Sequence, residues 1–277
     1  MNFFLLRSGR LAALSKLRPA RRLFSGTGLL LLLVLVAASP AADFDHTHAL
    51  LDRSLKAHVT NALVNYSALK ASPQQLDAYL AACAAVTEAT YEKWPEPQRL
   101  AFLINLYNAA TLRLILDHYP VKSIKKIGGF FSGPWAEPVV RLFGKTTTLG
   151  AVEHELLRVQ FDEPRLHFAI VCAARGCAPL RSEAYVADRI EQQLDEQGKA
   201  FLSNTAKNSV DVKTRTLYLS PIFKWFAEDF ERGHGSVAKF IAPYFPTAIR
   251  NELVRGDFRV KYTDYDWSLN EAPPSKK

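Results

Sequence analysis

The sequence lacks the features of a modular protein. Its 277 residues contain no internal repeat, no low-complexity run and no linker rich in glycine and serine. Beyond the N-terminal leader described below, about 235 residues remain, which is enough for one sizeable hydrophobic core. We therefore expect a single globular domain over residues 42–270, followed by a disordered tail at 271–277.

Acidic residues are absent from the first 42 positions, where six lysines and arginines stand. Removing these six charges from the net charge of +8 leaves about +2 for the rest of the chain. A nucleic-acid-binding domain would carry clustered lysine and arginine on one face. We therefore expect no nucleic-acid partner.

The N-terminal segment also lacks an apolar run of transmembrane length. Its run GLLLLLVLVAA (28–38) is shorter than the roughly 20 residues that span a bilayer. A basic start, a short apolar core and the small residues of SPAA predict a secretory signal over residues 1–41. No cysteine lies near the cleavage site, which excludes lipid attachment there. We expect a periplasmic or secreted protein; the alternative is an uncleaved N-terminal anchor that leaves the domain facing outward.

Several segments place apolar residues three and four positions apart, which predicts helices. These are residues 44–59, 73–86, 94–120, 149–158, 185–204, 220–233, 235–245 and 247–256. Strand patterns occur in a hairpin at 139–149, at 166–171, in a pair at 209–220 and at 258–270. Helices that precede and interrupt such strands predict an α+β fold, a helix-rich single domain around a small, mostly antiparallel sheet.

Two asparagines stand in the most apolar predicted helix, 94–120. Asn105 and Asn108 are three residues apart and therefore share one face. Buried amides need hydrogen-bond partners. Two explanations remain open: the amides bond the backbone of a neighbouring loop, or they face a cleft.

Cysteine is scarce, and two of the three cysteines lie close together. Cys83, on the predicted helix 73–86, is expected to be a small buried hydrophobe. Cys172 and Cys177 enclose Gly176, which adopts unusual backbone angles freely. In an oxidising compartment the pair could form a disulfide. A nucleophilic Cys177 and two plain buried thiols are the alternatives.

The nearby histidine does not favour a metal site. His-x4-Cys-x4-Cys lacks the short cysteine spacing of structural zinc sites. If 166–171 is a regular strand, His167 and Cys172 point to opposite faces. We expect no metal and no cofactor.

A catalytic thiol would need a base and an orienting group. His167 and His154 are the candidate bases for Cys177, Glu153 could orient one of them, and Asn105 or Asn108 could donate to an oxyanion. Neighbours on a helix point about 100° apart. We therefore do not expect Glu153 and His154 to line one narrow cleft together.

Six motifs occur in an order that resembles the family called domain of unknown function 547. They are NLYNA (105–109), HYP (118–120), VEHELLR (152–158), RLHFAIVCAARGCAPLRSEAY (165–185), KWFAEDF (224–230) and YDWSLN (265–270). The resemblance spans about residues 60–270. It departs from the family pattern at Ala178, which separates Cys177 from the proline that more typically follows it, and at Val171, where many members have asparagine.

The resemblance implies signature positions but no established reaction. They are Asn105, Tyr107, Asn108, Glu153, His154, Arg158, His167, Cys172 and Cys177. The family includes exported bacterial proteins and plant proteins with an added coiled coil.

Two functional hypotheses follow from these residues. The first is a thiol-dependent acyl transferase or hydrolase with a polar cleft. The second is a non-catalytic binding or scaffolding module of the cell envelope, in which a Cys172–Cys177 disulfide is structural. The partner is an unknown substrate or an envelope component.

Overall fold

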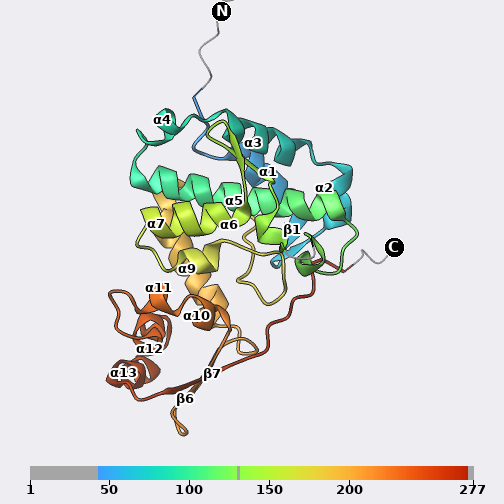
Figure 1. Cartoon of the computed structure of the whole chain (residues 1–277). Coiled ribbons are helices and arrows are strands. Elements are labelled where there is room, and N and C mark those ends of the chain that lie inside the picture. Colours follow the sequence, from blue (N-terminus) through green and yellow to red (C-terminus); the bar gives the residue numbers. More distant parts are fainter. Residues whose placement is uncertain (1–42, 130–131, 274–277) are drawn as a thin grey trace, which may run out of the picture. The chain divides into compact units, whose positions relative to one another are not determined.

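The long apolar helix α5 (Glu96–His118) organises the fold. In the computed structural model, which describes residues 43–129 and 132–273, it is buried along most of its length and packs against α3, η3 and η4 (Figure 1). Among the described residues it is the helix long and apolar enough to cross a membrane, and 89% of that apolar window is buried inside the protein. Its burial in the protein interior accounts for its composition.

The remaining helices are mostly short. The α-helices other than α5 are α1 (Ala49–His58), α2 (Tyr66–Ala71), α3 (Gln74–Ala85), α4 (Glu88–Tyr91), α6 (Leu149–Ala151), α7 (Arg158–Gln160), α8 (Leu166–Ala169), α9 (Ile190–Leu202), α10 (Ile222–Trp225), α11 (Ala227–Glu231), α12 (Val237–Ile241) and α13 (Thr247–Arg255). Four 3₁₀ turns, η1 (Ile124–Lys126), η2 (Pro134–Ala136), η4 (Ala187–Arg189) and η5 (Ala242–Tyr244), and one π-helical segment, η3 (Val152–Leu157), complete the described helical structure.

The strands are short and form separate sheets. They are β1 (Val59–Thr60), β2 (Leu63–Val64), β3 (Val140–Leu142), β4 (Lys145–Thr147), β5 (Ser209–Asp211), β6 (Thr216–Leu219) and β7 (Arg259–Tyr262). β1–β2, β3–β4 and β5–β6 pair antiparallel, whereas β7 pairs parallel to β6. The helix-rich α+β prediction is confirmed, but the described residues form three small sheets where one sheet was expected.

Two hydrophobic clusters fill the interior. The larger one surrounds α5 and includes the buried Cys83, as predicted. The smaller one joins α9 to the C-terminal helices through phenylalanines, with Phe168, Phe201 and Phe230 completely buried. Tyr265 packs against both clusters. A surface where two clusters meet is a natural place for a cleft.

The predicted strand at 166–171 is wrong. Leu166–Ala169 forms the helical turn α8, and the chain then runs extended from Ile170. The segment is apolar because α8 is buried, with His167 and Phe168 at most 3% exposed. A short buried apolar run does not distinguish strand from helix by its periodicity.

The predicted helix at 149–158 is present but contains a π-helical segment. Thr148 caps it by accepting a hydrogen bond from the Ala151 amide at 3.0 Å. The helix then widens over η3 and returns to α-helix in α7. π-Helical insertions are often found at functional sites.

Two predictions from the sequence concern the termini, a signal segment at 1–41 and a disordered tail at 271–277. The predicted signal segment lies outside the described residues. Residues 271 and 272, where the predicted tail begins, meet the first hairpin: Glu271 forms a parallel bridge with Val64, and the Ala272 amide donates to the Val64 carbonyl at 2.9 Å. Residues 274–277 lie outside the described part of the chain.

Candidate functional site

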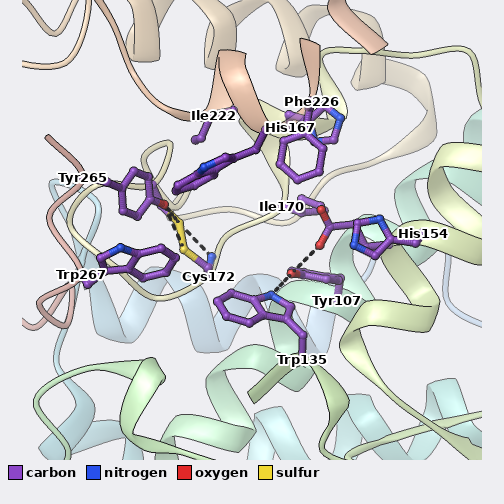
Figure 2. A pocket seen from close by; sticks show the side chains of 13 residues that line it. Tyr107, Trp135, His154, His167, Ile170, Cys172, Ile222, Phe226, Tyr265 and Trp267 are labelled. Carbon is purple, nitrogen blue, oxygen red and sulfur yellow. Dashed lines mark hydrogen bonds between the residues drawn. A yellow bond between two sulfur atoms is a disulfide. The ribbon is translucent and has the colours of Figure 1, made fainter. Parts of the chain in front are cut away.

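One cavity of about 370 Å³ collects most of the chemically active side chains. Its polar lining consists of Tyr107, Glu153, His154, His167, Cys172 and Cys177. Its aromatic lining consists of Trp135, Trp225, Phe226, Tyr265 and Trp267. Figure 2 shows Tyr265 and Trp267 on one side of this cavity and His154 on the other. The volume and the mainly apolar lining are typical of a small-molecule site.

A chain of hydrogen bonds leads to the buried carboxyl group of Glu153. Trp135 Nε1 donates to the Tyr107 hydroxyl at 3.1 Å, and that hydroxyl donates to Glu153 Oε2 at 3.1 Å (Figure 2). Burial raises the pKa of Glu153 to about 7, although Tyr107 and Arg158 favour the ionised form. The carboxyl group therefore exchanges its proton near neutral pH.

His167 is held by an ionic network behind the cavity. Its Nε2 donates to Asp229 Oδ2 at 2.7 Å, and its ring stacks on Phe226 with centroids 3.8 Å apart. Arg158 binds both oxygens of Asp229, at 2.6 Å and 3.0 Å. Burial lowers the pKa of His167 despite Asp229, so the ring is neutral at pH 7. Its Nδ1 is buried and makes no hydrogen bond within the described chain.

His154 lies beside this network. Its Nδ1 is 3.0 Å from Arg158 Nη1, and burial together with the Arg158 charge lowers its pKa. His154 is therefore also mainly neutral at pH 7.

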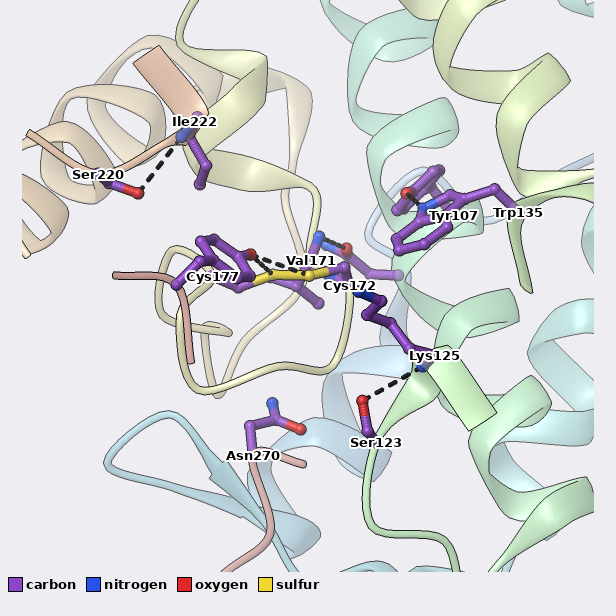
Figure 3. The surroundings of a disulfide bond; sticks show 12 residues. Tyr107, Ser123, Lys125, Trp135, Val171, Cys172, Cys177, Ser220, Ile222 and Asn270 are labelled. Carbon is purple, nitrogen blue, oxygen red and sulfur yellow. Dashed lines mark hydrogen bonds between the residues drawn. A yellow bond between two sulfur atoms is a disulfide. The ribbon is translucent and has the colours of Figure 1, made fainter. Parts of the chain in front are cut away.

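Cys172 and Cys177 form a disulfide that makes part of the cavity wall (Figure 3). The Tyr265 hydroxyl lies 3.2 Å from both sulfurs and donates to them, because a disulfide sulfur has no proton. The Cys172 amide donates to Cys177 Sγ at 3.0 Å. Within the described residues, no hydrogen bond joins either sulfur to a histidine.

The C-terminal motif YDWSLN holds the disulfide loop in place. The amides of Arg175 and Gly176 donate to the carbonyls of Ser268 and Asp266, each at 2.8 Å. A Cβ atom on Gly176 would lie 2.8 Å from the Tyr265 ring. Glycine therefore permits the close approach that places Tyr265 over the sulfurs.

Asn105 and Asn108 do not line this cavity. The Asn105 amide bonds both backbone groups of Tyr185, at 2.8 Å and 3.0 Å. The Asn108 amide donates to the Ala169 carbonyl and accepts from the Val171 amide, both at 2.9 Å. Of the two explanations left open by the sequence, bonding to neighbouring backbone is the one observed. Both side chains fix the loops that carry the site.

The family comparison agrees with the motifs around this cavity. A family model described as "Protein of unknown function, DUF547" matches residues 91–202. Residues 91–202 of the chain belong to this family. No curated protein and no solved structure matches it. The matched DUF547 region includes α5, the π-helical segment and the disulfide loop, whereas KWFAEDF and YDWSLN lie beyond it.

Two geometric expectations from the sequence fail in the DUF547 domain. His167 and Cys172 line the same cavity, because the segment between them is not a regular strand and strand alternation does not apply. Glu153 and His154 also line it together. A π-helical turn bonds residue i to i+5, so neighbouring side chains diverge by less than in an α-helix.

Sequence reasoning missed the aromatic wall and Asp229. Trp225, Phe226 and Asp229 belong to KWFAEDF, and Tyr265 and Trp267 to YDWSLN, so the motifs themselves marked them. Three of the four tryptophans in the sequence line this one cavity, which sequence spacing does not reveal. No cluster of His, Cys, Asp and Glu suited to a metal ion occurs in residues 43–129 and 132–273.

Proposed function

We propose that the domain is a ligand-binding module that holds a small organic group in the aromatic cavity. The observation that carries this proposal is the combination of an apolar aromatic wall with one buried carboxyl group, Glu153. A mostly apolar pocket with few polar groups is how proteins bind and orient small molecules. In this proposal the Cys172–Cys177 disulfide is structural and fixes one wall.

The disulfide also supports the proposed compartment. Disulfides persist in oxidising compartments outside the cytoplasm. Together with the signal-like N-terminus, this favours a periplasmic or secreted protein. Mass spectrometry of the mature N-terminus in the native protein tests cleavage near residue 41.

A fragment screen tests the binding function. Ligand-observed NMR with a mixed set of aliphatic and aromatic fragments should give hits that are lost in Trp225→Ala, because Trp225 is 47% exposed and lines the cavity. Tyr262→Ala is the matched control, since Tyr262 is a similarly exposed aromatic on β7 that does not line the cavity. Absence of hits at millimolar fragment concentration, or equal hits in Trp225→Ala, would refute the proposal.

A second candidate, the thiol-dependent hydrolase, is favoured by a different observation. Cys177 shares the cavity with both candidate bases, His154 and His167. After reduction of the disulfide, a histidine could accept the proton of the Cys177 thiol, and the thiolate could attack an ester carbonyl. The C–O bond then breaks, the alcohol leaves with the proton returned by the histidine, and water hydrolyses the resulting thioester. Neither asparagine is free to donate to the oxyanion, so the Tyr265 hydroxyl, 3.2 Å from both sulfurs, would be a side-chain donor close to the reacting atoms.

Reduction separates the two candidates. A hydrolase should cleave p-nitrophenyl esters only after treatment with a reductant, and Cys177→Ala should abolish the activity while Cys172→Ala retains it. A binding module should give the same fragment hits before and after mild reduction and should show no reductant-dependent esterase activity.

A further inference from the structure

Among the residues that the structure describes, the cavity is lined by aromatic rings and one acid but by no lysine or arginine. Glu153 is the single carboxyl group of this described lining. His154 and His167 have lowered pKa values, so both are mainly neutral at pH 7. An anionic ligand would meet no cationic side chain on this described part of the wall. The lining therefore selects for a neutral or a positively charged ligand.

The rings turn their faces in several directions. Tyr265 and Trp267 have centroids 4.5 Å apart at an interplanar angle of 50°, and Trp225 and Tyr265 are 4.8 Å apart at 56°. Trp135 meets Trp267 nearly edge-on, at 6.0 Å and 78°. Rings inclined in this way present π-faces around a volume instead of a single flat platform. Such walls attract a cation through the negative potential of each ring face.

Two of these rings already contact cations of the chain. Lys125 Nζ lies 4.9 Å from the Trp267 centroid, and Arg158 Cζ lies 5.4 Å from the Phe226 centroid. Neither cation lines the cavity itself. Tryptophan gives the strongest cation–π contacts of the aromatic side chains.

We infer that the cavity takes an alkylammonium cation, with its alkyl groups against the rings of Trp135, Tyr265 and Trp267 and its charge near Glu153. The inference rests on the proposed binding function and names its ligand class. A bulky alkylammonium group is weakly hydrated, so the apolar wall costs it less than it costs a compact ion. The carboxylate supplies the opposite charge that the described wall otherwise lacks.

Several groups surround Glu153 and set its charge. Tyr107 on α5, Arg158 on its own helix and Asp229 on α11 act on its pKa, Tyr265 of the C-terminal segment feels its charge, and His154 and His167 line the same cavity. Arg158 and Asp229 bind each other and largely offset one another. A bound cation favours the ionised carboxylate, so binding should release a proton from Glu153 and should weaken as the pH falls below about 7.

A pair of matched probes tests the inference. Choline carries a trimethylammonium group, and 3,3-dimethyl-1-butanol has the same shape with a neutral carbon in place of nitrogen. Quenching of tryptophan fluorescence in the full chain, checked by calorimetry, should show saturable choline binding at pH 8 and at least about tenfold weaker binding of the neutral probe. Choline binding should weaken by at least about tenfold at pH 5.5.

Two variants should change the affinity for choline in opposite directions. Glu153→Gln should weaken choline binding about tenfold or more and remove most of its pH dependence, with thermal unfolding confirming that the variant is folded. Lys125→Met should strengthen choline binding several-fold, because it removes a positive charge from the Trp267 ring. Lys126→Met is the matched control, since Lys126 is exposed and next to Lys125 but, unlike Lys125, makes no cation–π contact with Trp267.

The outcomes distinguish this inference from the binding function. Equal affinities for choline and 3,3-dimethyl-1-butanol, or weaker choline binding in Lys125→Met, would refute the inference that the ligand is a cation. The cavity would then remain a binding site for neutral groups. If neither probe binds, the inference of a cationic ligand is also refuted. The fragment screen then decides separately whether the cavity binds ligands.

Discussion

Replacing Asn108 by alanine should destabilise the protein by about 3 kcal/mol. The substitution removes the donor to the Ala169 carbonyl and the acceptor for the Val171 amide, both buried. Each buried backbone group left without a partner costs about 1–3 kcal/mol, so two cost about 4 kcal/mol. Alanine is the better helix former by about 0.5–0.7 kcal/mol, which offsets a small part of that loss.

Urea denaturation followed by circular dichroism measures this loss, and the melting temperature should fall by about 9 °C. Thr111→Val is a matched control on the same helix. Thr111 is also completely buried, but its hydroxyl makes no hydrogen bond within the described residues. Its replacement should leave the free energy of unfolding unchanged or slightly higher. A loss below about 1 kcal/mol for Asn108→Ala, or an equal loss in both variants, would refute the assigned role of the asparagine.

Three further predictions concern the cavity. Because burial raises the pKa of folded Glu153 to about 7, the wild type should lose about 3 kcal/mol of stability relative to Glu153→Gln as the pH rises from about 4.5 to 8. Urea denaturation of both proteins across this pH range measures the difference, and equal pH dependence of the two unfolding free energies would contradict the prediction. Taking the difference between the two proteins removes the contribution of the histidines, whose lowered pKa values change stability with pH in the opposite direction. Cys172→Ser should lower the free energy of unfolding by about 2 kcal/mol, as expected for a short closed loop, and should make stability insensitive to reductant. Gly176→Ala should force the Tyr265 ring aside, at a cost of about 1–3 kcal/mol and with altered tryptophan fluorescence, whereas Gly133→Ala, whose added Cβ meets nothing within 4 Å, should change neither.

Part of the site could be predicted from local sequence. The apolar pattern of residues 94–120 predicted α5, and two asparagines on one face of that helix had to have partners. The short spacing of Cys172 and Cys177 made their disulfide one of few alternatives. These properties depend on residues close together in the chain, where periodicity and spacing carry the information.

The errors arose where distant segments meet. Residues 166–171 were predicted as a strand because burial, which makes them apolar, hides the difference between helix and strand. The mistaken alternation then separated His167 from Cys172, although both line the cavity. Nothing local marked Asp229 as the partner of His167, since the two are 62 positions apart in the sequence.

The sequence alone therefore determined the helix-rich α+β class, the long central helix and the small set of side chains able to do chemistry. Tertiary structure decided which of them act together. It bonded the Asn105 and Asn108 side chains to neighbouring backbone, and it gathered three tryptophans and Glu153 around one cavity. The physical reason is that burial and electrostatic environment are properties of packed neighbours. A carboxyl group acquires a pKa near 7 only where segments far apart in the chain exclude water from it.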